Sequence, residues 1–279
     1  MKATQDWLNA TSRKYLANAN TSAFVHLGKY TAELYQTGAG EPIVMIPGLA
    51  GGFELLSPMA GALACRNRIH AYQLRGENDC FILRHPFDLD DLVEDFAELL
   101  DALKLERPIV MGLSFGGIIA LKFAIRYPQR LDRLIVQGVG ARYEGGLMQQ
   151  IAGTVLSRFP LPADNPFVNQ FFNLLFGCKQ KRDSLFEFVT QQIWQTDQSV
   201  MAHRFRLVEE LNLENQLGRI KAPTLVLTGD RDVLVSQRSL QPLCDEIPNV
   251  QMVRLPNCGH LAFVTRPDLI AKKVEEFLS

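Results

Sequence analysis

Short runs rich in apolar and β-branched residues recur along the chain. They cover residues 43–46, 69–74, 109–112, 134–136, 223–227 and 250–255. Several are bounded by proline or glycine and contain almost no polar side chain, a pattern typical of strands buried on both faces. Two further β-rich runs, 24–27 and 30–35, flank a glycine-containing turn and predict a hairpin near the start.

Helical patterns separate these runs. Residues 89–105 carry apolar side chains at helical spacing, and 118–127 are apolar on almost every side. Residues 236–247 and 266–278 predict two more helices. Strands that alternate with helices need crossover connections, and these place helices on both faces of a parallel sheet. We therefore expect an α/β fold with a mostly parallel central sheet flanked by helices.

The stretch from about 140 to 217 interrupts this alternation. It contains no strand-like run and is rich in phenylalanine, from Phe159 to Phe205. A structureless loop of this length is uncommon inside a compact domain. The stretch is therefore predicted to be a helical insertion packed over the sheet.

Composition excludes several classes of protein. The 279 residues carry a formal net charge of −1, with 47% hydrophobic and 21% charged residues. A nucleic-acid binder usually has a basic excess, which is absent here. No apolar run reaches the length of a membrane span, and the start of the chain lacks a signal-peptide pattern. The five cysteines are odd in number, with no Cys-x-x-Cys spacing, so we expect a cytoplasmic protein without disulfides or a zinc site.

The most informative motif is Gly112-Leu113-Ser114-Phe115-Gly116. It follows a predicted strand directly and precedes a predicted helix. A serine on such a turn presents its hydroxyl at the carboxyl edge of the sheet, and the flanking glycines leave room for the neighbouring backbone. Ser114 is therefore the candidate nucleophile.

A serine hydroxyl needs a general base, and the base needs a carboxylate to orient it. His260 lies after the last predicted strand, so it emerges at the same sheet edge as Ser114. Asp230 and Asp232 both follow the strand 223–227. The order along the chain is then serine, aspartate, histidine, and both aspartates satisfy it.

Oxyanion donors are expected from two main-chain N–H groups. One belongs to Phe115, directly after the nucleophile, and the other to the loop 47–52 that follows the first buried strand. Within that glycine-rich loop Leu49 is the first choice and Ala50 the second.

These motifs together resemble the α/β-hydrolase fold family across nearly the whole chain. The resemblance favours Asp232 as the acid, because the family commonly has it in the fourth position of Gly-x-x-Asp. It implies a core domain of residues 1–139 and 218–279 and a helical cap over 140–217. It also implies that no metal or organic cofactor is needed. Pro47 stands where the family often has histidine, and the turn 75–79 lacks the usual Gly-x-Gly-x-Ser run, which affects the expected pocket wall.

The function expected from this resemblance is hydrolysis of a carboxylic ester, lactone or thioester of a small, largely apolar compound through an acyl-enzyme. A carbon–carbon bond hydrolase with the same triad is an alternative, and its dienoate substrate would need a basic residue such as Arg75 or Arg142. An acyltransferase and, less favoured, a non-catalytic ligand receptor are the others. The expected partner is a small molecule rather than nucleic acid or a membrane, and a homo-oligomer stays open.

Overall fold

The computed structural model describes residues 22–77, 86–157, 166–177 and 184–279. These residues form an eight-stranded sheet in the order β1-β2-β4-β3-β5-β6-β7-β8. The strands are β1 (Ser22–Leu27), β2 (Tyr30–Thr37), β3 (Glu41–Ile46), β4 (Asn67–Tyr72), β5 (Ile109–Leu113), β6 (Leu134–Gln137), β7 (Thr224–Gly229) and β8 (Val250–Leu255). Strand β2 pairs antiparallel with both β1 and β4. The other neighbours in the sheet, from β4 and β3 to β7 and β8, pair in parallel. The predicted mostly parallel sheet is confirmed.

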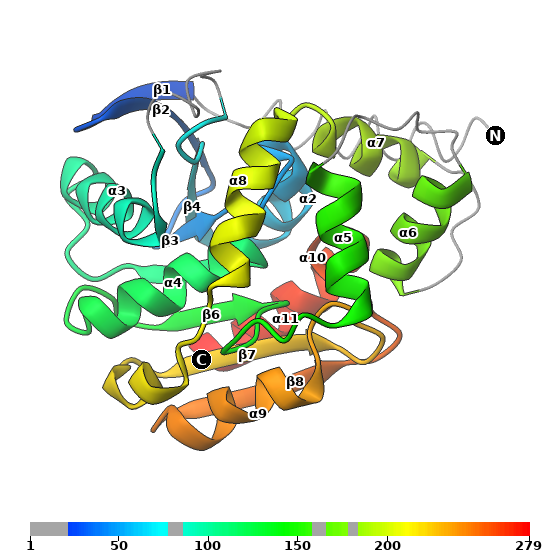
Figure 1. The fold of residues 1–279 in the computed structure, drawn as a ribbon. Helices are drawn as coiled ribbons and strands as arrows, with labels where there is room; N and C mark the ends of the chain where they lie inside the picture. The colour runs from blue at the N-terminus through cyan, green and yellow to red at the C-terminus, as the bar shows by residue number, and fades with distance from the viewer. Residues whose placement is uncertain (1–21, 78–85, 158–165, 178–183) are drawn as a thin grey trace.

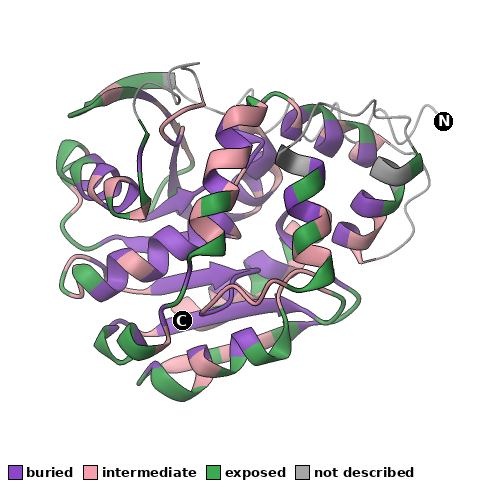
Figure 2. Ribbon diagram, in the orientation of Figure 1, coloured by how far each residue is buried: buried purple, intermediate pink, exposed green. Residues whose placement is uncertain are grey.

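Helices cover both faces of the sheet (Figure 1). One face packs on α3 (Leu89–Ala102), α4 (Phe115–Arg126) and α9 (Gln237–Glu246). The other packs on α2 (Gly52–Leu63), α10 (Ala262–Thr265) and α11 (Pro267–Leu278). Alternate residues of β3 point to the two cores, as the two-residue period of a strand requires. Figure 2 shows these central strands buried and the outer helices exposed on one side.

Helix α2 is the core element that the sequence pattern did not reveal. Gly51, in a left-handed conformation, precedes it, and Pro58 lies inside it. Most of its side chains are buried, so it has no polar stripe that would mark a helical period. The short α10 was also not predicted. The helix expected directly after the Ser114 turn is α4, which begins at Phe115.

Between β6 and β7, the described residues form four α-helices: α5 (Leu147–Ser157), α6 (Pro166–Phe176), α7 (Ser184–Ile193) and α8 (Gln198–Glu209). A 3₁₀ helix, η1 (Glu214–Arg219), leads back to β7. Figure 1 shows α5 to α8 as one group at the upper centre and right. Phe171, Phe172 and Phe186 are buried among them, while Phe159, Cys80, Cys178 and residues 78–79 of the predicted turn lie outside the described residues. Within the described ranges, no helix is long and apolar enough to cross a membrane.

Candidate active site

Ser114 occupies a sharp turn between β5 and α4. Its φ and ψ are 53° and −116°, a region that residues with a side chain rarely adopt. The glycines around it permit close packing, because a Cβ on Gly116 would lie 2.2 Å from the carbonyl oxygen of Ile46. A Cβ on Gly112 would lie 2.4 Å from the carbonyl oxygen of Gly116. The predicted strand–turn–helix around Ser114 is therefore held by backbone-to-backbone contact.

Gly116→Ala is expected to lower the free energy of unfolding by about 3 kcal/mol or more, because the added methyl group would lie 2.2 Å from the carbonyl oxygen of Ile46, whose strand is paired with β5. The matched control is Gly48→Ala, whose Cβ would have nothing closer than 3.6 Å. This control is expected to change stability by about 0.5 kcal/mol or less. Thermal and urea unfolding of both variants measure the difference. Equal stability of the two would contradict the tight packing at Gly116.

His260 links Ser114 to Asp232. Its Nε2 lies 2.8 Å from the Ser114 Oγ, and its Nδ1 lies 3.0 Å from the Asp232 Oδ2. Both side chains are nearly inaccessible to solvent, at 7% for His260 and 1% for Asp232. These contacts bring together three residues from the ends of β5, β7 and β8.

The environment of Asp232 favours its charged form. Burial by itself raises the pKa of this carboxyl group, but the adjacent His260 and two backbone N–H groups outweigh burial and lower the pKa below its usual value. The Oδ1 atom accepts the N–H of Leu234 at 2.9 Å and of Val235 at 3.1 Å. A fixed negative charge beside Nδ1 orients the imidazole so that Nε2 faces the serine.

Asp230, the other candidate acid, lies in different surroundings. It is exposed, and its Oδ1 accepts the backbone N–H of Cys258 at 3.1 Å. The backbone N–H of Asn257 is the main cause that lowers the pKa of Asp230. Asp230 thus supports the turn before His260, while Asp232 contacts the imidazole.

Two glutamines that sequence reasoning missed support this arrangement. Gln137, fully buried at the end of β6, donates its Nε2 to the carbonyl oxygen of His260 at 3.1 Å. Gln149 of α5 donates its Nε2 to the carbonyl oxygen of Leu234 at 3.0 Å. A polar residue ending an apolar strand was the only sequence signal for Gln137, and Gln149 had none.

Leu49 and Phe115, the expected oxyanion donors, both line the cavity in front of Ser114. Phe115 is the first residue of α4, so its N–H lies at the helix N-terminus, where free backbone N–H groups favour negative charge. Gly48 brings the other loop close, since a Cβ there would lie 3.8 Å from the Cβ of Ser114. Leu49 and Phe115 therefore share one cavity with Ser114, and their role as oxyanion donors stays a prediction.

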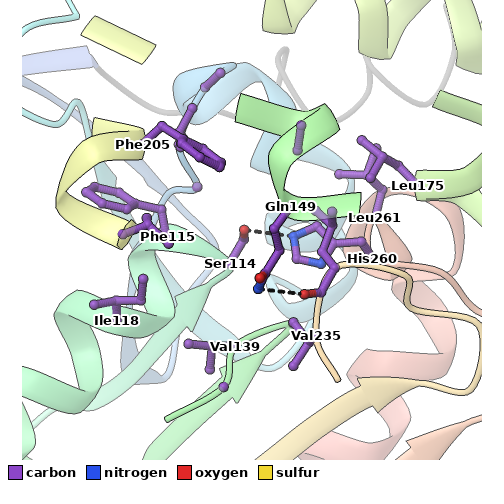
Figure 3. Close-up of a pocket in the computed structure, with 18 of the residues that line it drawn as sticks. Ser114, Phe115, Ile118, Val139, Gln149, Leu175, Phe205, Val235, His260 and Leu261 are labelled. Atoms are coloured by element: carbon purple, nitrogen blue, oxygen red, sulfur yellow. Dashed lines mark hydrogen bonds between the residues drawn. The ribbon is translucent and has the colours of Figure 1, made fainter. Parts of the chain in front are cut away.

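The cavity beside Ser114 has a volume of about 150 Å³ and a mostly apolar lining. Figure 3 shows Ser114 between two groups of apolar side chains: Phe115, Ile118, Val139 and Phe205 on one side, and Leu175 and Leu261, next to His260, on the other. The helices α5, α6 and α8 supply part of this wall. Such a lining suits a ligand with apolar groups on both sides of its reacting centre.

The two arginines considered for binding a carboxylate are already paired. Arg142 is the one Arg or Lys among the described residues that line the cavity, and it contacts Glu144 at 3.2 Å and Glu214 at 2.7 Å. Arg75 donates its Nε to Asp95 at 2.9 Å, away from the cavity lining. In the part of the chain that the structure describes, no group of three or more His, Cys, Asp or Glu side chains could hold a metal ion.

Comparison with known proteins gives a consistent result. The sequence model of the alpha/beta hydrolase fold family matches residues 41–267. A poly(3-hydroxyalkanoate) depolymerase of Ectopseudomonas oleovorans is 28% identical over 85% of this chain and 84% of its own length. A 2-hydroxy-6-oxo-2,4-heptadienoate hydrolase of Pseudomonas putida is 26% identical over 94% and 98%. The crystal structure of a hydrolase from Pseudomonas aeruginosa superposes with a TM-score of 0.80 at 25% identity, over 94% of this chain and all of that one.

Proposed function

This chain belongs to the α/β-hydrolase fold family and is a hydrolase, and from that premise we propose that it cleaves carboxylic esters, lactones or thioesters of small, largely apolar compounds. The observation that carries the proposal is the hydrogen-bonded series Ser114–His260–Asp232 at the wall of an apolar cavity. A nucleophile, a base and a group that orients the base are the parts that acyl transfer requires.

In this mechanism, the Ser114 Oγ attacks the carbonyl carbon as its proton moves to the His260 Nε2. The N–H groups of Leu49 and Phe115 stabilise the oxyanion that forms. His260 then gives its proton to the leaving group, and an acyl-enzyme remains on Ser114. A water molecule, activated by His260, repeats the attack and releases the acid. Asp232 stays charged throughout and stabilises the imidazolium.

The domain division follows the same proposal. We propose that the hydrolase core lies within 1–139 and 218–279 and the cap within 140–217, where the described helices α5 to α8 contribute residues to the cavity wall. Phe171, Leu175 and Phe205 from this cap face the cavity and would contact the apolar part of the substrate.

An ester is preferred over a carbon–carbon bond because of charge. The Pseudomonas putida relative is named for an anionic dienoate, whose carboxylate would need a cation in the cavity. Arg142 is already paired with two glutamates, and Arg75 is held by Asp95. The Ectopseudomonas oleovorans relative is named for poly(3-hydroxyalkanoate), a polyester. Its units are joined by carboxylic ester bonds and carry apolar side chains. The apolar lining favours this second chemistry.

An acyltransferase would use the same acyl-enzyme, with an alcohol or amine replacing water. Product analysis in the presence of added alcohols separates transfer from hydrolysis. A ligand receptor of the same fold would bind without reacting. Labelling of Ser114 by a fluorophosphonate separates an enzyme from a receptor, because only an activated serine is labelled quickly.

The test of the proposed function is hydrolysis of p-nitrophenyl esters from acetate to palmitate, with 2-hydroxy-6-oxo-2,4-heptadienoate as the competing substrate. Each methylene that enters the cavity is expected to raise kcat/KM about fourfold, since its burial contributes ~0.8 kcal/mol, until the cavity is filled. The ester series should therefore show a chain-length optimum. Faster cleavage of the dienoate than of every ester would overturn the proposal in favour of the carbon–carbon alternative.

A further inference from the structure

The most deeply buried charge in the described part of the cap belongs to Arg204 of α8. Its side chain is 0% exposed, yet it does not line the cavity. Nη1 donates to the carbonyl oxygen of Leu49 and to the Glu77 Oε1, both at 2.9 Å. Nη2 donates to the carbonyl oxygen of Arg75 at 2.9 Å. The guanidinium thus joins the cap to the loop after β3 and the turn after β4.

Its partner Glu77 supplies the balancing charge. The Glu77 side chain is 6% exposed, and burial raises the pKa of its carboxyl group, while the adjacent Arg204 acts in the opposite direction. A buried ion pair contributes little net stability, because desolvation of both charges offsets their attraction. Stability alone is therefore a weak explanation for this ion pair. The hydrogen bond from Arg204 to the Leu49 carbonyl suggests a different role.

The loop 47–52 is held from two directions. From the core, α4 packs against it so closely that a Cβ on Gly116 would lie 2.5 Å from the carbonyl oxygen of Pro47. From the cap side, Arg204 binds the Leu49 carbonyl, and Thr196 Oγ1 accepts the N–H of Gly51 at 2.9 Å. The cap therefore contacts the loop at two backbone groups, one on each side of Ala50.

Holding the Leu49 carbonyl sets the direction of the nearby N–H groups. The peptide between Leu49 and Ala50 is planar, so its carbonyl and the Ala50 N–H turn together. The hydrogen bond from Arg204 to this carbonyl also restricts rotation about the backbone of Leu49. The N–H of Leu49 itself belongs to the preceding peptide. Both candidate donors of this loop thus depend on a carbonyl that Arg204 binds.

We propose that Arg204, charge-balanced by Glu77, is a positioning residue that holds the oxyanion loop from the cap side, so that docking of α8 completes the oxyanion site. This inference rests on the proposed function for the identity of the loop as a donor. A carboxylate-binding role for Arg204 does not fit, because its three bonds already run to protein oxygens and Arg204 itself does not line the cavity.

The test uses the double variant Arg204→Met/Glu77→Met. Replacing a buried ion pair by apolar side chains of similar volume is often neutral for stability, so this variant removes the bond to Leu49 without leaving a buried charge. Arg204→Lys, which keeps the charge but lacks the planar fork, is the second variant and covers the case in which the double variant does not fold. The matched control is Arg206→Met, an exposed arginine on the same helix.

The expected result is a fall in kcat of about 10²-fold for the double variant, near the loss measured when one oxyanion donor is removed, with KM within about threefold of wild type. Affinity for a trifluoromethyl ketone, which forms an oxyanion on the serine, should fall in parallel. Affinity for the matching methyl ketone should not change. End-point labelling by a fluorophosphonate gives the number of folded sites in each sample. The control Arg206→Met should match wild type in kcat, KM and trifluoromethyl ketone affinity.

Two results would overturn the proposal. One is unchanged kcat and unchanged trifluoromethyl ketone affinity in a folded variant, which would leave Arg204 with a structural role only. The other is a rise in KM with kcat preserved, which would place Arg204 in substrate binding. If the wild-type protein hydrolyses no ester, the proposed function fails independently of this inference. The rate at which a fluorophosphonate labels Ser114 then tests Arg204 in the same variants, because phosphonylation uses the same oxyanion donors.

Discussion

Ser114→Ala is expected to lower kcat for the best p-nitrophenyl ester by about 10⁶-fold, and His260→Ala by a similar factor. The reason is that the 2.8 Å contact between Oγ and Nε2 transfers the proton as the bond to carbon forms, so either residue alone is ineffective. The double variant Ser114→Ala/His260→Ala should be no slower than either single variant, because the two side chains act as one unit. Single-turnover release of p-nitrophenol measures all three.

The control for this experiment is Ser57→Ala. Ser57 is a buried serine whose hydroxyl donates to the carbonyl oxygen of Glu54 within α2. The Ser57→Ala variant should retain activity within about threefold of wild type. Circular dichroism and Tm show whether each variant is folded. Substantial turnover by folded Ser114→Ala would rule out the acyl-enzyme on this residue.

Asp232→Asn is expected to reduce kcat by about 10⁴-fold, the effect seen when the orienting aspartate of a serine triad becomes an amide. An asparagine at this buried position can present an N–H to Nδ1, and the imidazole then adopts the tautomer that cannot accept the serine proton. The loss of negative charge also leaves the imidazolium without its partner. Pre-steady-state kinetics with an activated ester measure the acylation rate directly.

Asp230→Asn is the matched control, because it makes the same change two residues away in an exposed side chain. It should lower kcat by no more than about threefold, since the amide oxygen can still accept the Cys258 N–H. The assignment of the acid is wrong if Asp230→Asn is the damaging change and Asp232→Asn is mild.

The sequence predicted the fold well where structure depends on neighbouring residues. The strand 109–112 became β5, and the helix expected at 236–247 became α9, because burial of apolar faces imposes a period that is visible in the sequence. Helix α2 was missed for the same reason: with most of its side chains buried, it shows no contrast between two faces. For α2, periodicity therefore carried no signal, and Pro58 inside the helix counted against it.

For the candidate site, the residues alone left Asp230 and Asp232 open, and resemblance to the family favoured Asp232. The structure distinguishes them by environment: Asp230 is exposed beside Cys258, whereas the Asp232 side chain is 1% exposed and lies 3.0 Å from the imidazole. Side chains two residues apart in an irregular turn can point in different directions, and apolar spacing and turn residues do not specify which one faces the imidazole.

By itself, the sequence determined the alternation of strands and helices in the sheet, the turn that carries Ser114, and the family. These are local properties: apolar spacing, glycines at a tight turn and the chain order of a few chemical groups. Only the tertiary structure decided which side chains support the site, such as Arg204 against Leu49 and Gln137 against His260. Such partners lie more than a hundred residues apart in the chain. Their contact depends on how α8 packs on the loop after β3 and how β6 lies beside the loop that carries His260.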